Sequence, residues 1–216
     1  MRYRLCYEIK GPLSFLSHLE IMRLWQRAVL RSGLPVAWSE GFNPRPRISL
    51  GPARGVGIEG EKEYLDIEFR REIDTGELLE SLNDILPEGV RALSFRDLGE
   101  GEKRLEAVIN EAVYRVRFNG GVPADLEEKI AAFLAGEHCF FVRKSPKGEK
   151  EIDLRAYVSD MEVCDGGFRL DVSLGNGGSL RVAELLTVFD YWDIIKDIKI
   201  ERMGLFVSDG EQRHTP

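Results

Sequence analysis

Residues 2–10 read Arg2-Tyr3-Arg4-Leu5-Cys6-Tyr7-Glu8-Ile9-Lys10. Polar and large apolar side chains alternate along this stretch, which is typical of a strand with one buried face. Gly11 and Pro12 end the strand. Ser17 and Glu20 then have the spacing of a capping box, which predicts a helix that runs to about Ser32. The fold therefore begins with a strand followed by an amphipathic helix.

The same signals continue through the first half of the chain. We expect further strands at residues 47–50, 63–69 and 90–95, and a second helix at residues 74–86 that ends at Pro87. The resulting order is β-α-β-β-α-β, which is the ferredoxin-like unit.

The order recurs after a glycine- and charge-rich segment at residues 98–104. Strands are expected at residues 111–118, 139–144, 151–158, 168–174 and 198–207, and helices at 123–135 and 182–191. We therefore predict an α+β fold of two tandem ferredoxin-like (βαββαβ) domains, at residues 1–99 and 100–216. The second domain would contain an inserted hairpin strand, and the polar tail from Ser208 is expected to be frayed.

Composition excludes several functional classes. The 216 residues include three widely spaced cysteines (Cys6, Cys139 and Cys164) and three histidines without ligand spacing. This pattern is neither a disulfide framework nor a zinc or iron–sulfur motif, so we expect no metal and no cofactor. The longest apolar runs are shorter than a membrane span, and we expect a cytoplasmic protein without a membrane partner.

Charge is distributed unevenly along the chain. Residues 1–55 hold nine Lys/Arg against three acidic residues, a net charge of +6, whereas the whole chain carries −7. A basic face on an acidic body attracts an anionic partner, since the local field matters more than the sum.

A proline- and arginine-rich loop, residues 39–52, follows the first helix. Proline fixes φ and glycine permits unusual backbone conformations, so this loop is stiff and shaped. Arginines on such a loop suit phosphates, and an aromatic beside them would stack a base, as single-stranded RNA is commonly held. The loop and its borders supply the candidate nucleic-acid-binding residues Trp38, Phe42, Asn43, Arg45, Arg47 and Arg54. Trp38 and Phe42 are equally compatible with the core.

Arg23, Arg27 and Arg31 are spaced to form one stripe on the first helix. This stripe is either a solvated face or, together with the loop arginines, a surface that contacts several phosphates. Lys144 and Lys147, at an expected hairpin tip, are a second candidate contact in the other domain.

Two segments of the first half resemble the radical SAM-linked proteins, a bacterial family of unknown function encoded beside or fused to radical SAM proteins. They are Phe15-Leu16-Ser17-His18-Leu19 with Arg27-Ala28, and residues 39–49 with the run Gly41-Phe42-Asn43-Pro44. Residues 150–155 (Lys-Glu-Ile-Asp-Leu-Arg) extend the likeness into the second half. The resemblance implies a radical SAM enzyme as partner, one that acts on RNA. The iron–sulfur and SAM chemistry would then belong to that partner.

A more distant likeness is to the CRISPR repeat-processing endoribonucleases, which also pair two ferredoxin-like domains. His18 would match their histidine near the first helix, with Tyr7 or Lys10 assisting it, but the glycine-rich C-terminal loop of those enzymes has no counterpart here.

The sequence thus predicts a non-catalytic RNA-binding accessory protein for a radical SAM enzyme, with tRNA or rRNA as the RNA. The alternatives are a metal-independent endoribonuclease that uses His18, and a docking module for the radical SAM partner.

Overall fold

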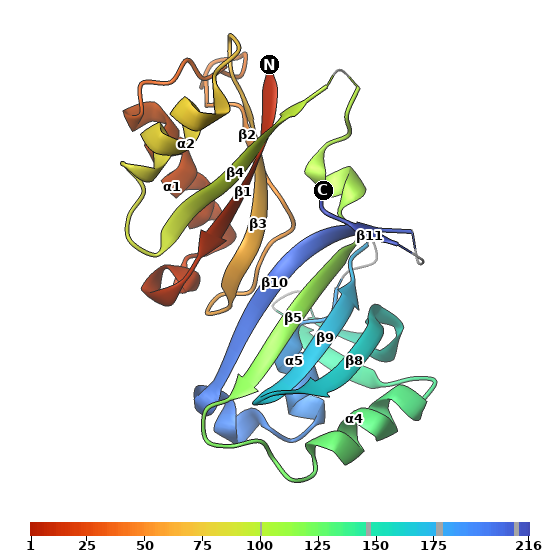
Figure 1. The fold of residues 1–216 in the computed structure, drawn as a ribbon. Coiled ribbons are helices and arrows are strands. Elements are labelled where there is room, and N and C mark those ends of the chain that lie inside the picture. Colours follow the sequence, from red (N-terminus) through yellow and green to blue (C-terminus); the bar gives the residue numbers. More distant parts are fainter. Residues whose placement is uncertain (100, 146–147, 176–178, 210–211) are drawn as a thin grey trace. The chain divides into compact units, whose positions relative to one another are not determined.

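The structure is a computed structural model that describes residues 1–216 except 100, 146–147, 176–178 and 210–211. The chain has a mixed α+β fold (Figure 1). It divides into two units: residues 1–109 with 204–216, and residues 110–203. Among the described residues no helix is both long and apolar enough to cross a membrane.

The first unit contains a sheet and two main helices, and these strands and helices follow one another in the predicted β-α-β-β-α-β order. Its elements are β1 (Arg2–Ile9), η1 (Gly11–Phe15), α1 (His18–Arg31), β2 (Ile48–Leu50), β3 (Glu59–Glu68), α2 (Thr75–Asn83), β4 (Val90–Leu98), α3 (Leu105–Val108) and β11 (Arg213–His214). Antiparallel pairing places β1 between β4 and β3, and β2 pairs with β3. The strands and both main helices predicted for this half are present, with ends shifted by a few residues.

Alternation along β1 separates the two faces of this sheet. Tyr3, Leu5, Tyr7 and Ile9 are buried in the hydrophobic core with residues of α1 and α2, and these two helices lie on the same face (Figure 1). The ring of Tyr7 packs edge-on against Trp25 of α1, with ring centroids 5.0 Å apart. The intervening residues of β1 therefore face the opposite side of the sheet.

The start of α1 is the predicted capping box. The backbone N–H of Glu20 donates to Ser17 Oγ at 3.4 Å, and the backbone N–H of Ser17 donates to the Glu20 carboxylate at 2.8 Å. The Ser17 hydroxyl also donates to the Glu20 carboxylate at 2.7 Å, and this bond, with the one from the Ser17 N–H, holds the pKa of Glu20 below its ordinary value. Orphan amides at the helix start are thus satisfied.

Replacing Ser17 by alanine is expected to lower the free energy of unfolding by about 1 kcal/mol, because the cap acceptor is lost. Urea denaturation measures the change. Ser17→Thr keeps the hydroxyl and should stay close to wild type, so equal stabilities of the alanine and threonine variants would contradict the role of the cap.

The second unit repeats the alternation of strands and helices. Its elements are β5 (Glu111–Phe118), α4 (Leu126–Ala135), β6 (Phe140–Ser145), β7 (Gly148–Asp153), η2 (Arg155–Tyr157), β8 (Val158–Cys164), β9 (Gly167–Ser173), α5 (Val182–Val188), η3 (Trp192–Asp197) and β10 (Ile198–Ser208). β9 lies between β5 and β8, and β6 and β7 form a separate two-stranded hairpin. The prediction of one strand at residues 151–158 was wrong, since β7 ends at Asp153 and β8 begins at Val158. A register shift between Val158 and Asp160 breaks the alternation that would have indicated β8.

The division between the units differs from the predicted boundary at residues 99–100. Leu105 of α3 and Ile109 are buried, and residues 101–109 belong to the first unit. Residues 204–216 return to that unit as the end of β10 and as β11. The tail is therefore not frayed at its described end, because Arg213 and His214 pair with β10 and Pro216 is buried.

Candidate nucleic-acid interface

The segment between α1 and β2 forms a hydrogen-bonded hairpin, which we call the arm (residues 36–47). Its two sides are joined by bonds from the Arg47 N–H to the Ala37 oxygen and from the Ser39 N–H to the Arg45 oxygen, both 2.8 Å. The Arg45 N–H also donates to Ser39 Oγ at 3.0 Å. At the tip, Gly41 has φ +117°, a conformation that glycine adopts without strain. The predicted stiff loop is thus an ordered arm.

The base of the arm is fixed to the end of β3. The Ala37 N–H donates to the Glu68 oxygen at 2.8 Å, and the Glu68 N–H donates to the Arg47 oxygen at 3.0 Å. Side-chain bonds add to this anchor: Arg47 Nη1 contacts the Glu68 carboxylate at 3.0 Å and Arg47 Nε donates to the Trp38 oxygen at 3.2 Å. Arg47 therefore holds the arm together rather than standing free for a phosphate.

Two aromatic side chains of the arm face solvent. Phe42 is fully exposed at the tip, with a relative accessibility of 106%, and Trp38 is 40% exposed. The sequence left open whether these rings belong to the core, and the structure places both on the surface. An aromatic ring that stays exposed to water contributes no favourable free energy of burial, whereas a partner that covers the ring would supply it.

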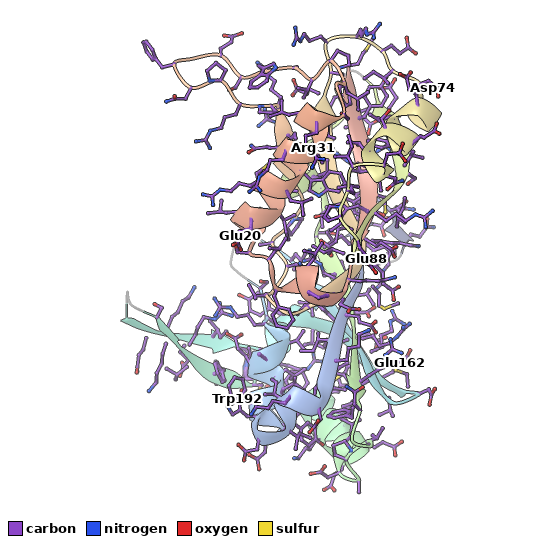
Figure 2. All side chains as sticks on the ribbon, turned by 90° about the vertical axis from the view of Figure 1, so that its left-hand side faces the viewer. Glu20, Arg31, Asp74, Glu88, Glu162 and Trp192 are labelled. Carbon is purple, nitrogen blue, oxygen red and sulfur yellow. The ribbon has the colours of Figure 1, made fainter. Side chains whose placement is uncertain are left out.

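The arginine stripe on α1 is exposed along its length. Arg23, Arg27 and Arg31 face solvent, while Trp25 and Val29 on the opposite side of the helix are fully buried. Figure 2 shows Glu20 and Arg31 at opposite ends of α1, with the arm leaving beyond the Arg31 end. The stripe thus leads along the helix toward the arm.

A shallow hollow of about 350 Å³ runs beside this stripe. Arg27 and Arg31 line it together with Leu24 and the Glu20 carboxylate of α1, and with Ile85 and Pro87 of the α2–β4 connection. The two arginines outnumber the one carboxylate. Guanidinium groups at the rim of a partly apolar hollow suit a ligand that combines phosphates with flat bases.

The other predicted arginines differ in accessibility. Arg45 is exposed and forms no ion pair with the described residues, so it is available to a partner. Arg54 is buried, and its Nη1 donates to the Ser14 oxygen at 3.0 Å. Burial removes Arg54 from the proposed contact surface. Asn43 is exposed beside Phe42.

His18 is the first residue of α1 and is half-buried. Its suggested assistants are not set up for catalysis: Tyr7 is buried against Trp25, and the ammonium group of Lys10 contacts Glu8 at 2.6 Å. That hydrogen bond raises the pKa of Lys10, so this side chain stays cationic at neutral pH.

Lys144 and Lys147 belong to the second unit. Lys144 is exposed near the end of β6, with its ammonium group 3.4 Å from Glu149, whereas Lys147 lies outside the described residues. Residues 175–178 (Gly-Asn-Gly-Gly), whose Asn-Gly pair favours a turn in the sequence, also lie partly outside the described residues. In the described part of the chain, no group of three or more His, Cys, Asp or Glu side chains is arranged to hold a metal ion.

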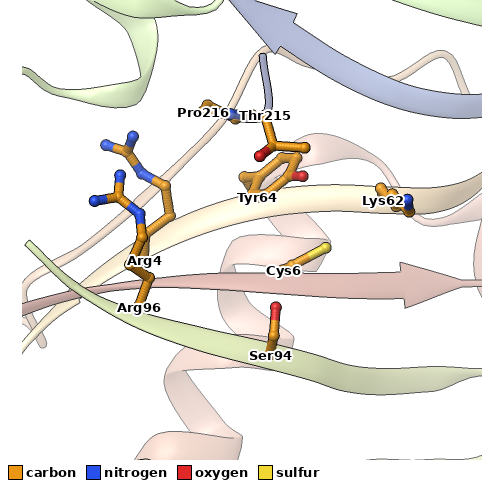
Figure 3. Close-up of a pocket in the computed structure, with 8 residues that line it drawn as sticks. All are labelled: Arg4, Cys6, Lys62, Tyr64, Ser94, Arg96, Thr215 and Pro216. Carbon is orange, nitrogen blue, oxygen red and sulfur yellow. The ribbon is translucent and has the colours of Figure 1, made fainter.

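Sequence reasoning missed a polar pocket on the other face of the first unit's sheet, shown in Figure 3. It includes Arg4 and Cys6 of β1 and Tyr64 of β3. The available signal was the alternation along β1, which places Arg4 and Cys6 away from the core.

A protein-family model matches most of the chain. A family described as "Uncharacterized protein conserved in bacteria (DUF2344)" matches residues 2–182. The chain belongs to this family. The description names no reaction, ligand or partner, so the radical SAM link implied by the sequence resemblance stays a prediction.

Other comparisons add little. No match was found among curated proteins. One similar solved structure is titled "Crystal Structure of a Cbf5-Nop10-Gar1 Complex", with 11% identity over 93% of this chain and 47% of that chain, and a TM-score of 0.47. This chain therefore spans about half of the solved one, and the likeness at that TM-score bears on neither the fold nor the ligand.

Proposed function

We propose that this protein is a non-catalytic RNA-binding accessory protein that contacts RNA with the arm and α1 of its first unit. The observation that carries the proposal is the ordered arm, which presents the fully exposed ring of Phe42 and the exposed Arg45 at its outer end. A base stacks on an aromatic face whatever its identity, and arginine contacts the adjoining phosphates.

The exposed charges on α1 extend this surface. Arg23, Arg27 and Arg31 would track the RNA backbone while Phe42 holds a base. Neutralised phosphates release counterions, so binding by such a surface weakens steeply as salt rises. Residues 56–216 are net acidic and would repel RNA, so RNA would bind preferentially at the basic surface of the arm and α1.

A radical SAM enzyme is the proposed partner, and this part of the proposal rests on the resemblance of residues 15–19, 39–49 and 150–155 to the radical SAM-linked proteins. The partner would supply the chemistry, and this chain would deliver or orient the RNA. For the fold, we propose that the two units are tandem ferredoxin-like domains. The pairing of β1 between β4 and β3, and of β9 between β5 and β8, supports it.

A tagged pull-down from lysate, with and without ribonuclease, tests this function. We expect RNA to co-purify with the tagged protein, together with a protein partner. A partner that is lost after ribonuclease treatment was held through the RNA, and one that stays was bound directly. Absence of any RNA above the level of an untagged control would contradict the proposal.

The second candidate is a protein docking module, and the exposure of Phe42 also favours it, because apolar rings anchor protein interfaces. In that case the radical SAM partner survives ribonuclease treatment in the pull-down and is lost when Phe42 is replaced. If the protein instead binds RNA, replacement of Phe42 reduces the amount of RNA that co-purifies.

Phe42→Ala is expected to weaken binding of single-stranded RNA by about 1–3 kcal/mol, since one stacked base is lost. Fluorescence anisotropy with a labelled oligonucleotide measures it. Phe15→Ala is the matched control, because Phe15 is also an exposed phenylalanine of the first unit but lies in η1, outside the arm. If both variants bind as wild type does, Phe42 does not stack on RNA.

A further inference from the structure

The face of the first unit's sheet opposite to α1 and α2 carries a pocket of about 440 Å³. Figure 3 shows the residues that line it, which come from three strands and the C-terminal segment of the same unit. They are Arg4 and Cys6 of β1, Lys62 and Tyr64 of β3, Ser94 and Arg96 of β4, and Thr215 and Pro216. The volume falls within the range of small-molecule sites.

The lining is cationic. Among the described residues it contains the side chains of Arg4, Lys62 and Arg96, and no aspartate or glutamate. Carboxylates outside the lining orient two of these cations: Asp66 holds Arg4 at 2.8 and 3.0 Å, and Glu102 holds Arg96 at 2.8 and 2.9 Å. Both guanidinium groups are thereby fixed in position before any ligand arrives.

Several donors at the pocket remain available. Arg4 is only 4% exposed, and its Nε and Nη2 donate to Asp66 and to the Lys103 oxygen. Its Nη1 donates to no atom of the described residues, nor do the Lys62 ammonium group and the Ser94 hydroxyl. A guanidinium N–H that reaches the pocket can donate a charge-assisted hydrogen bond to an anionic acceptor, which is stronger than a neutral one.

The floor of the pocket carries no negative charge at neutral pH. Burial raises the pKa of the Cys6 thiol, and this outweighs the hydrogen bond from the Tyr64 hydroxyl and the charge of Lys62, which lower it. Burial, together with the neighbouring Cys6, also raises the pKa of Tyr64. Both groups are neutral, so neither repels an anion.

We propose that this pocket binds a small phosphorylated ligand, with Lys62 as a donor to its phosphate group and with Ser94 and Arg4 as donors to the rest of the ligand. Lys62 forms no ion pair with the described residues, so its charge favours an oxyanion, and the volume exceeds what inorganic phosphate fills, which leaves room for a nucleoside. The pocket lies on the sheet face opposite to α1, so this site is independent of the proposed RNA surface.

Cys6 provides a direct test, because its thiol lines the pocket and is absent from the RNA surface. The full chain is alkylated with N-ethylmaleimide in inorganic phosphate, pyrophosphate or AMP, at constant ionic strength, and the modified cysteines are quantified by mass spectrometry. We expect Cys6 to react about tenfold more slowly at a ligand concentration ten times the dissociation constant. Cys139 and Cys164, both half-buried in the second unit, are internal controls that should not change.

Lys62→Ala is expected to weaken this protection roughly tenfold or more, since a charge-assisted hydrogen bond is lost. Lys150→Ala removes an exposed lysine of the second unit and should leave it unchanged. AMP protecting at lower concentration than phosphate identifies a nucleotide as the source of the phosphate group, and equal protection identifies free phosphate. Protection no greater than in sodium chloride, or equal in Lys62→Ala and wild type, overturns the proposal.

Discussion

Replacing Asp66 by alanine is expected to lower the free energy of unfolding by about 3–5 kcal/mol. Asp66 and Arg4 form an ion pair on β3 and β1, with relative accessibilities of 3% and 4%. Removal of the carboxylate leaves the guanidinium buried, with the Lys103 oxygen as its one remaining acceptor among the residues that the structure describes. Such an uncompensated charge costs much more than the pair itself contributes. Chemical denaturation monitored by circular dichroism measures the change.

A solvent-exposed pair of the same sheet gives the matched control. Arg47 and Glu68 are 44% and 37% exposed, and Glu68→Ala should change stability by no more than about 1 kcal/mol. The double variant Arg4→Met with Asp66→Leu removes both charges and should be less destabilised than Asp66→Ala. Unfolding of Asp66→Ala within 1 kcal/mol of wild type would show that Arg4 finds another partner or water.

Substitution of Arg23, Arg27 and Arg31 together by glutamine is expected to remove most RNA binding by the first unit. All three side chains are exposed, so the change leaves the buried face of α1 intact, and glutamine retains helix propensity. If each arginine neutralises one phosphate of a single strand, the slope of log K against log salt becomes shallower by about 2. Affinity should fall by at least tenfold near 0.1 M salt.

The control variant must remove the same charge elsewhere. Arg91, Lys150 and Lys196 are exposed and lie outside the arm and α1, so their joint replacement by glutamine matches the net charge of the test variant. If both variants lose the same affinity for RNA, then RNA binding depends on the net charge of the protein and not on the arginines of α1.

Local sequence signals predicted most strands and the main helices of both units. The alternation in β1 and β5 and the capping box at Ser17 depend on neighbours in the chain, and these elements were found at or within one residue of the predicted positions. β8 was missed because its register shift destroys the alternation. The return of residues 204–216 to the first unit was missed because it depends on contacts far apart in the sequence.

The candidate surface was predicted less completely, for a similar reason. Residue type alone cannot separate Arg45, which is exposed, from Arg54, which is buried on the Ser14 oxygen, or from Arg47, which bonds to Glu68. The periodicity of α1 did place its arginines on the solvent side. Only the hydrogen bonds of the arm reveal that Phe42 stands at the tip of an ordered hairpin.

The most direct measurement of the central claim is the affinity of the purified protein for labelled tRNA and single-stranded RNA by fluorescence anisotropy, across a salt series. We predict measurable binding at low salt that weakens steeply as salt rises, and whose salt dependence flattens in the Arg23, Arg27 and Arg31 variant but not in its charge-matched control. Absence of binding to either RNA at low salt would contradict the account.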